Sequence, residues 1–170
     1  SSRGDAKIAF FAWLYGSKTA VSQDQATQLS SFYQKEELLK KYWVDGNVMT
    51  PYGKTIPDVS AHHALNYLVQ STAAELLLKQ ALKISELLRR RNSQSHIAFL
   101  VHDSIVLDLK REDLELVESI SYLFGSTNFG TFKLIHKKER VGRNPKNKKE
   151  IKGLSKIIIK NRESRKGMFI

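Results

Sequence analysis

The sequence predicts an α+β fold, because two helical patterns stand beside a pair of runs typical of antiparallel strands. The chain opens on a helical spacing of apolar residues over about 3–14, and a much longer helical pattern covers 60–91. Two β-rich runs, 97–101 and 105–107, are separated only by His102-Asp103-Ser104, so they should pair through a tight turn. An antiparallel hairpin backed by a long helix belongs to the α+β class.

The remaining elements follow in chain order. Gly16 stands where the opening helix should end, and the polar stretch 17–31 has only weak helical character. The long helix is the strongest prediction, because an apolar stripe that includes Leu65, Leu76 and Ile84 persists through many turns. The other expected elements are a helix over 31–42, a hairpin over 44–56, a helix over 112–124 and a strand over 131–135.

Length and composition exclude several classes of protein. A chain of 170 residues is long enough for one sizeable core, or for one domain with a tail. Cysteine is absent, which excludes a disulfide scaffold, a thiol nucleophile and a zinc site with Cys ligands. No apolar run approaches the roughly 18 residues of a membrane span, and the amino terminus lacks the layout of a signal peptide. We therefore expect a soluble intracellular protein without a membrane partner, and the abrupt opening without Met suggests a piece of a longer chain.

The basic residues are concentrated at the carboxy-terminal end. Residues 1–136 hold 15 basic and 14 acidic side chains, whereas residues 137–170 hold 13 basic and 3 acidic ones. Such asymmetry is typical of a segment that binds a polyanion, most often nucleic acid. A solvated tail without a partner is the alternative that charge alone leaves open.

A stripe of four residues marks the opening helix. Arg3, Lys7, Phe11 and Tyr15 recur in steps of four, which places them along one side of a helix. Cations in the first turns of a helix oppose its macrodipole, so a bound anion would explain their position. Two cations followed by two aromatic rings would suit a triphosphate followed by a base. The alternative is an ordinary amphipathic helix with solvated cations and aromatic residues in the core.

Asp103 is the most conspicuous carboxylate. It lies at the tip between two runs that are apolar on both faces, where a carboxylate is usually paired or bound to a metal. An Asp chosen only for its turn conformation is the alternative.

Asn66 and Gln70 lie four residues apart on the long helix, on or beside its apolar stripe. Their amides could donate to the minor-groove acceptors that all base pairs share, which gives contact without sequence choice. A plain polar border of a core helix is the alternative.

In this order, these residues resemble the carboxy-terminal half of the polymerase unit in family A DNA polymerases, which include bacterial repair polymerase and several phage replicases. The family's motif B, Arg-x3-Lys-x7-Tyr-Gly with an aromatic residue four after the Lys, is matched by Arg3, Lys7, Phe11, Tyr15 and Gly16. The segment Asn66-x3-Gln70-Ser71-Thr72-Ala73-Ala74-Glu75 is similar to Asn-x3-Gln-Gly-Thr-Ala-Ala-Asp. Val101-His102-Asp103 is similar to motif C and Gly142-x-Asn144 to the closing Gly-x-Asn, so the resemblance covers about residues 1–145.

The resemblance implies the architecture of a template-directed DNA polymerase. Residues 1–56 would be a portion of the fingers, with the nucleotide-binding helix over about 3–15. Residues 57–145 would be a portion of the palm, whose antiparallel sheet carries the motif C hairpin and is backed by long helices. Residues 146–170 would remain as a basic tail.

The resemblance also implies roles for single residues. Arg3 and Lys7 would bind the phosphates of an incoming dNTP, with Lys7 taking part in catalysis, while Phe11 would lie against its sugar and Tyr15 near the template base. The implied contacts with the DNA primer–template are Asn66, Gln70 and His102. Asp103 would be catalytic, as one of two carboxylates that hold a pair of Mg²⁺ ions for phosphoryl transfer.

The sequence departs from the family in three places. Ser104 stands where the family usually has Glu, and the stretch between Gly16 and Asn66 is shorter than in typical members. Motif A, the Asp-x-Ser-x-x-Glu segment with the other metal-binding Asp, is absent, and Asp108 cannot replace it because an odd separation from Asp103 on one strand reverses the face. The remainder of the polymerase, in the same polypeptide or a separate subunit, would have to carry motif A and the thumb.

Two other functions compete with this interpretation. Tyr15-Gly16-Ser17-Lys18 and His102-Asp103-Ser104 are similar to a phage-type single-subunit RNA polymerase, but Phe11 stands where those enzymes usually carry Met. A non-catalytic remnant that only binds nucleic acid is the second alternative. Such a remnant would need neither a triphosphate clamp nor a metal-binding carboxylate, so we expect the DNA polymerase part.

Overall fold

The computed structural model describes residues 3–15, 21–140 and 154–161, with backbone only for Arg3, for 137–140 and for 154–161 apart from Ile159. The chain divides into two compact units, Ser1–Glu75 with Phe169–Ile170, and Leu76–Met168. The division falls within the long helix, rather than after residue 56 where the sequence suggested a boundary. The mixture of helices with small antiparallel sheets confirms the α+β class.

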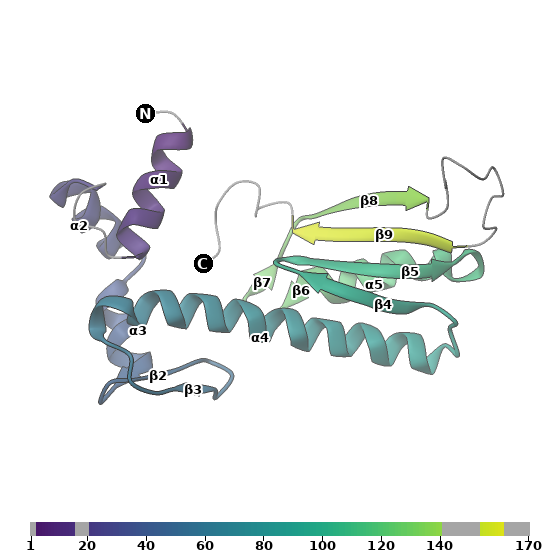
Figure 1. Ribbon diagram of the computed structural model, residues 1–170, viewed down its shortest axis with the longest axis horizontal. Coiled ribbons are helices and arrows are strands. Elements are labelled where there is room, and N and C mark those ends of the chain that lie inside the picture. Colours follow the sequence, from purple (N-terminus) through teal and green to yellow (C-terminus); the bar gives the residue numbers. More distant parts are fainter. Residues whose placement is uncertain (1–2, 16–20, 141–153, 162–170) are drawn as a thin grey trace, which may run out of the picture. The chain divides into compact units, whose positions relative to one another are not determined.

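The first unit combines helices with a small sheet (Figure 1). Its elements are α1 (Arg3–Leu14), α2 (Gln23–Phe32), α3 (Lys35–Tyr42), β1 (Trp43–Val44), β2 (Asn47–Met49), β3 (Thr55–Ile56) and the first half of α4 (Ala61–Arg90). The expected hairpin over 44–56 is a three-stranded antiparallel sheet in the order β1-β2-β3. Asp45 and Gly46, both with positive φ, form the first of its turns.

Two helices occupy the region where the sequence predicted one that begins at residue 31. The helix α2 begins early because Ser22 forms a capping box with Gln25, in which each side chain bonds the other residue's backbone N–H. The chain then breaks at Gln34, whose φ of 49° and ψ of 43° are left-handed. The predicted boundary was wrong because it followed the apolar spacing and missed the polar cap.

Aromatic side chains hold the helices of the first unit together. Trp13 is 3% exposed and packs with Leu14 and Leu65, which joins α1 to α4. The indole Nε1 of Trp13 donates to Ser30 Oγ at 2.9 Å, which ties α1 to α2. The position of α1 is therefore set by its buried residues, and Phe11 of the stripe packs against the same cluster.

The second unit contains a four-stranded antiparallel sheet in the order β4-β5-β9-β8. Its strands are β4 (His96–Val101), β5 (Ser104–Lys110), β8 (Leu134–Arg140) and β9 (Leu154–Asn161). The other elements are the second half of α4, the 3-10 helix η1 (Arg111–Leu116), α5 (Val117–Gly125) and a short pair β6 (Ser126–Thr127) and β7 (Gly130–Thr131). The predictions of the long helix and of the β4–β5 hairpin are confirmed. The helix over 112–124 begins as a 3-10 turn, and the predicted strand over 131–135 starts three residues late, at Leu134.

The strand β9 corrects the expectation of a basic tail from residue 146 onward. Leu154–Asn161 lies between β5 and β8, and Ile159 is fully buried opposite Ile105. β-branched residues suit a buried strand. The lysines around Ile157-Ile158-Ile159 concealed this strand, because they make the whole segment look like a solvated tail.

One face of this sheet packs against α4 and α5, and α4 runs lengthwise beside the strands (Figure 1). The core that results is built from all of these elements: Ile84 and Leu88 of α4, Ile105, Leu107 and Leu109 of β5, Ile120 and Phe124 of α5, and Ile159 of β9. Gln80 of α4 is 2% exposed, and its Nε2 donates to the carbonyls of Leu123 at 2.6 Å and Ser126 at 2.7 Å. This amide satisfies acceptors where α5 ends, so it fixes the connection from α5 to β6. Across the residues that the structure describes, no helix is long and apolar enough to cross a membrane.

Candidate functional site

The predicted stripe on α1 forms a continuous row of contacts. Lys7 Nζ lies 5.8 Å from the centroid of the Phe11 ring, a cation–π arrangement. The rings of Phe11 and Tyr15 are stacked at 5.9 Å between centroids with 14° between their planes. Tyr15 follows the helix directly, and its N–H still donates to Phe11 O at 2.9 Å. Lys7, Phe11 and Tyr15 therefore lie together, with Lys7 and Tyr15 exposed and Phe11 half-buried.

The amide of Gln70 joins this row from α4. Its Nε2 donates to Tyr15 Oη at 3.4 Å, a long hydrogen bond on an exposed surface. Asn66 lies one turn earlier on the same face of α4, and its Oδ1 is buried without a hydrogen-bond partner among the described residues. The structure thus brings Gln70, an implied contact of the DNA, to Tyr15, an implied contact of the nucleotide.

Other residues that carry the family resemblance, in motif B and in the closing Gly-x-Asn, are outside this description. The side chain of Arg3 is not described, although its backbone begins α1. Gly16, Gly142 and Asn144 lie outside the described residues.

The hairpin tip carries His102 and Asp103, as the sequence predicted. Val101 pairs with Ser104, so His102 and Asp103 form a two-residue turn, and His102 has a φ of 51°. The Oδ1 of Asp103 accepts a hydrogen bond from Ser104 Oγ at 3.2 Å, and the Asp103 side chain is half-buried. Ser104, which stands where a carboxylate was expected, therefore orients the carboxylate beside it.

The described residues do not assemble a metal site. No group of three or more His, Asp or Glu side chains that could hold an ion occurs among them. Asp108 lies at the opposite end of the hairpin, in register with His96, and its Oδ2 is 3.7 Å from His96 Nε2. Asp103 is therefore a single candidate ligand among the described residues. Enzymes that act on substrate phosphates usually bind Mg²⁺ through one or two carboxylates together with those phosphates and water.

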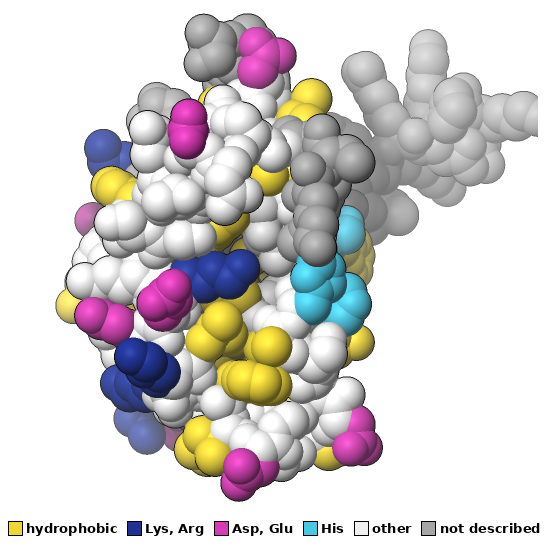
Figure 2. Space-filling view, turned by 90° about the vertical axis from the view of Figure 1, so that its left-hand side faces the viewer, with side chains coloured by type: hydrophobic (Ala, Val, Ile, Leu, Met, Phe, Trp, Pro, Cys, Tyr) yellow, Lys and Arg dark blue, Asp and Glu magenta, His cyan; other side chains and the backbone are white. Residues whose placement is uncertain are grey.

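One acidic side chain lies close to two basic ones on α4. Arg89 and Arg90 contact Glu86 at 2.8 and 2.6 Å, and their hydrogen bonds lower the pKa of Glu86 to about 2. In the face of the molecule drawn in Figure 2, described basic and acidic side chains are interspersed among hydrophobic ones. This mixture agrees with the near balance of charge over residues 1–136.

A carboxylate network closes the base of the β4–β5 hairpin. Asp113 Oδ2 accepts from Ser93 Oγ at 2.7 Å and from Ser95 Oγ at 2.5 Å, and Ser95 Oγ in turn accepts from the Lys110 N–H at 2.8 Å. The hydroxyl of Ser95, followed by that of Ser93, lowers the pKa of Asp113. The network anchors the start of β4 to the end of β5, at the end of the hairpin away from Asp103.

Sequence reasoning missed Phe99, which a β-bulge turns to the other face of the sheet. Ile97 pairs with Leu107, but Phe99 pairs with Val106, so Ala98 is an extra residue in β4. Ile97 and Leu100 both pack against the core, whereas Phe99 is 47% exposed. The run Ile97-Ala98-Phe99-Leu100-Val101 is apolar throughout, so nothing in it revealed which side chains face the helices.

Comparisons with known proteins concern two parts of this chain. A family model described as "Bacterial DNA-binding protein" matches residues 115–166, less than half of the chain, a range that includes α5, β8 and β9. The chain is also similar to DNA polymerase I of Lactococcus lactis subsp. cremoris (strain MG1363), with 30% identity over 77 residues. That similarity covers 39% of this chain and 9% of the polymerase, so the chain spans a small part of that relative. Both descriptions name proteins of DNA metabolism or DNA binding.

Proposed function

We propose that this chain binds DNA and is the part of a template-directed DNA polymerase that carries the nucleotide-binding helix and the motif C turn. The observation that carries the proposal is the row of contacts Lys7–Phe11–Tyr15–Gln70 in the first unit. The similarity to a DNA polymerase I and to a DNA-binding family supports its nucleic-acid part.

The row has the chemistry that an incoming nucleotide requires. The exposed Lys7 ammonium would neutralise phosphate oxygens, with Arg3 one turn before it on α1. Tyr15 is 45% exposed, which leaves part of its ring accessible to a base. The long Gln70–Tyr15 hydrogen bond is weak enough for a base or a minor-groove acceptor to replace it, which would free Gln70 for DNA.

In the second unit, Asp103 would supply one carboxylate to a pair of Mg²⁺ ions, which activate the attacking 3′-OH and stabilise the leaving pyrophosphate in such enzymes. The hydrogen bond from Ser104 would hold that carboxylate, and His102 would contact the primer end. A second carboxylate would have to come from the remainder of the polymerase, so we expect no nucleotide addition by this chain alone.

The test is a titration of the full chain with a fluorescent primer–template that has a recessed 3′ end, with and without Mg²⁺ and the next complementary dNTP. We expect the dNTP to tighten DNA binding, and Lys7→Ala to remove about 10- to 150-fold of nucleotide affinity, because a charge-assisted hydrogen bond contributes about 1.5–3 kcal/mol. Lys41→Ala is the matched control, because Lys41 Nζ lies 5.0 Å from the Tyr42 ring in α3, away from the row.

A DNA-binding module without catalysis is the second candidate, favoured by the family match over residues 115–166. Such a module would hold the primer–template equally well with and without Mg²⁺ and dNTP, and Lys7→Ala would then behave like Lys41→Ala. That result would remove the polymerase part of the proposal and leave DNA binding intact.

A further inference from the structure

We propose that the exposed side of the first half of α4 lies along the backbone of double-stranded DNA, and that the hydroxyl of Tyr67 bonds a phosphate. The inference rests on the proposed DNA binding. It adds a surface, a duplex partner and a contact residue at a position that the motif Asn-x3-Gln leaves open. Four residues form this surface, the outer α4 face: His63, Tyr67, Gln70 and Ala74.

The outer α4 face is open to solvent along its whole length. Its residues follow one another in steps of four, three and four, so helix geometry keeps their side chains within one narrow sector. All four residues are exposed, and Tyr67 is 45% exposed. The buried residues of the same turns lie on the opposite side of the helix: Ala64, Leu65 and Leu68. The core of the first unit therefore does not use this face.

Tyr67 carries a polar group that the described part of the fold leaves unused. Within that part, no hydrogen bond and no ring contact involves Tyr67. Gln70 lies one turn later on the same face and donates to Tyr15 Oη at 3.4 Å, so the outer α4 face continues the row of contacts from α1. Tyr and Gln side chains are among those that bond phosphate and sugar oxygens of DNA.

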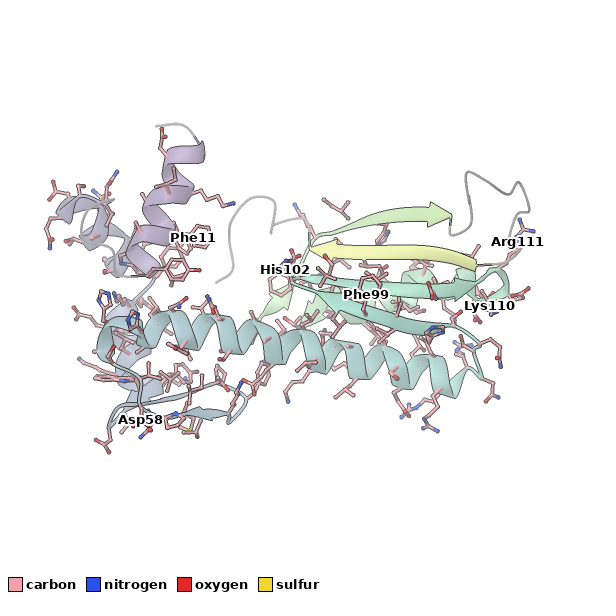
Figure 3. The ribbon with its side chains drawn as sticks, viewed as in Figure 1. Phe11, Asp58, Phe99, His102, Lys110 and Arg111 are labelled. Atoms are coloured by element: carbon pink, nitrogen blue, oxygen red, sulfur yellow. The ribbon has the colours of Figure 1, made fainter. Side chains whose placement is uncertain are left out.

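The charge pattern identifies the occupant as a polyanion. Residues 59–74 contain no acidic side chain, and the first turn of α4 lacks the acidic residue that a helix dipole would favour there. Two exposed histidines occupy that turn, His62 and His63, with their rings edge to face at 4.8 Å. Asp58 precedes the segment and lies on the side of α4 away from α1 (Figure 3), and Glu75, which follows it, is half-buried. A phosphate backbone thus meets no like charge from α4 along this face.

The length and rigidity of the outer α4 face favour a duplex over a single strand. From His63 to Ala74 the helix rises about 16 Å, which matches about five base-pair steps. Donors fixed along a rigid helix suit phosphates that repeat at a regular spacing. A flexible single strand would instead stack its bases on the ring of Tyr67. Tyr67→Phe separates these two modes, because it keeps the ring and removes only the hydroxyl.

The experiment titrates the full chain with a fluorescein-labelled blunt duplex of 14 base pairs, by anisotropy at 50 mM salt without Mg²⁺ or dNTP. We expect Tyr67→Phe to weaken duplex binding by about 10-fold, because a hydrogen bond to a charged group contributes about 1.5 kcal/mol. Tyr122→Phe is the matched control, since Tyr122 is 71% exposed on α5 and its change should leave the affinity within twofold of wild type.

Two opposite charges at Ala74 test the other end of the outer α4 face. Lys and Glu are both good helix formers, so Ala74→Lys and Ala74→Glu differ mainly in charge. Ala74→Lys should tighten duplex binding and steepen the slope of log affinity against log salt concentration by about 0.9, because it adds one phosphate contact. Ala74→Glu should weaken duplex binding, because like charges repel. Circular dichroism at 222 nm checks that the helices are intact in every variant.

Wild-type affinity in Tyr67→Phe, or equal affinity in the two Ala74 variants, would overturn the inference. Failure of the inference is distinguishable from failure of the proposed function. If Tyr122→Phe weakened duplex binding and Tyr67→Phe did not, residues 115–166 would hold the DNA, and DNA binding would stand without this face. If the wild-type chain bound the primer–template with dNTP but not the blunt duplex, the polymerase proposal would stand alone. If it bound neither probe, both proposals would fail.

Discussion

Replacing Ile159 by Ala tests whether the basic carboxy-terminal segment is part of the folded sheet. Ile159 is fully buried in β9, opposite Ile105 and within the core that α4, α5 and β5 share. Truncating a buried Ile to Ala costs about 2–5 kcal/mol, through lost transfer free energy and the cavity left behind. Ile159→Ala should therefore lower the free energy of unfolding of the second unit by about that amount.

The assay is urea denaturation followed by circular dichroism at 222 nm. With a urea slope of about 1–3 kcal/mol per molar, the midpoint should fall by roughly 1 M or more. Ile8→Ala is the matched control, because Ile8 is 62% exposed on α1 and its truncation should change stability by no more than about 0.5 kcal/mol. Trp13 and Trp43, the two tryptophans of the chain, both lie in the first unit, so their fluorescence reports that unit separately. An Ile159→Ala variant as stable as Ile8→Ala would refute β9 and restore a solvated tail.

The other predictions concern three residues of the second unit. Gln80→Met should cost about 2–4 kcal/mol in thermal or urea unfolding, because it takes the Gln80 donor away from two partly buried carbonyls. A loss below about 0.5 kcal/mol would show that water replaces the amide. The pKa of Asp113 is lowered in the fold, so its contribution to stability is present above its unfolded pKa near 4 and is lost as pH falls through the folded value. Urea unfolding at pH 7 and pH 3 should therefore show a smaller difference in Asp113→Asn than in the wild type, and equal differences would contradict that role. Asp103→Ala should leave DNA affinity nearly intact while it abolishes nucleotide addition by an assembled polymerase in a primer-extension assay; surviving activity would remove Asp103 from the metal site.

Local spacing was sufficient to predict the parts of the fold that depend on a single element. Lys7, Phe11 and Tyr15 follow one another at steps of four, and helix geometry alone places them in a row. The hairpin tip at His102 and Asp103 was equally predictable, because two apolar runs with three residues between them leave room only for a tight turn. What α1 packs against was not predictable, since the bond from Trp13 to Ser30 joins residues 17 positions apart.

The features that sequence reasoning missed depend on partners that are distant in the chain. The strand β9 pairs with β5 and β8, and Ile159 meets Ile105 in the core; a segment rich in lysine gives no sign of such pairing. The bulge at Ala98 adds one residue inside an apolar run, where every residue suits either face. The break at Gln34 is a backbone conformation that a polar residue adopts without a sequence signature.

The salt dependence of DNA affinity tests the central claim, DNA binding, most directly. Each phosphate that a basic side chain neutralises contributes about −0.9 to the slope of log affinity against log salt concentration. With 13 basic residues after position 136, engagement of a third of them predicts a slope of about −3 to −5 for the full chain on a primer–template between 50 and 200 mM salt. A slope near zero, or no measurable binding at 50 mM salt, would contradict DNA binding and with it the proposed function.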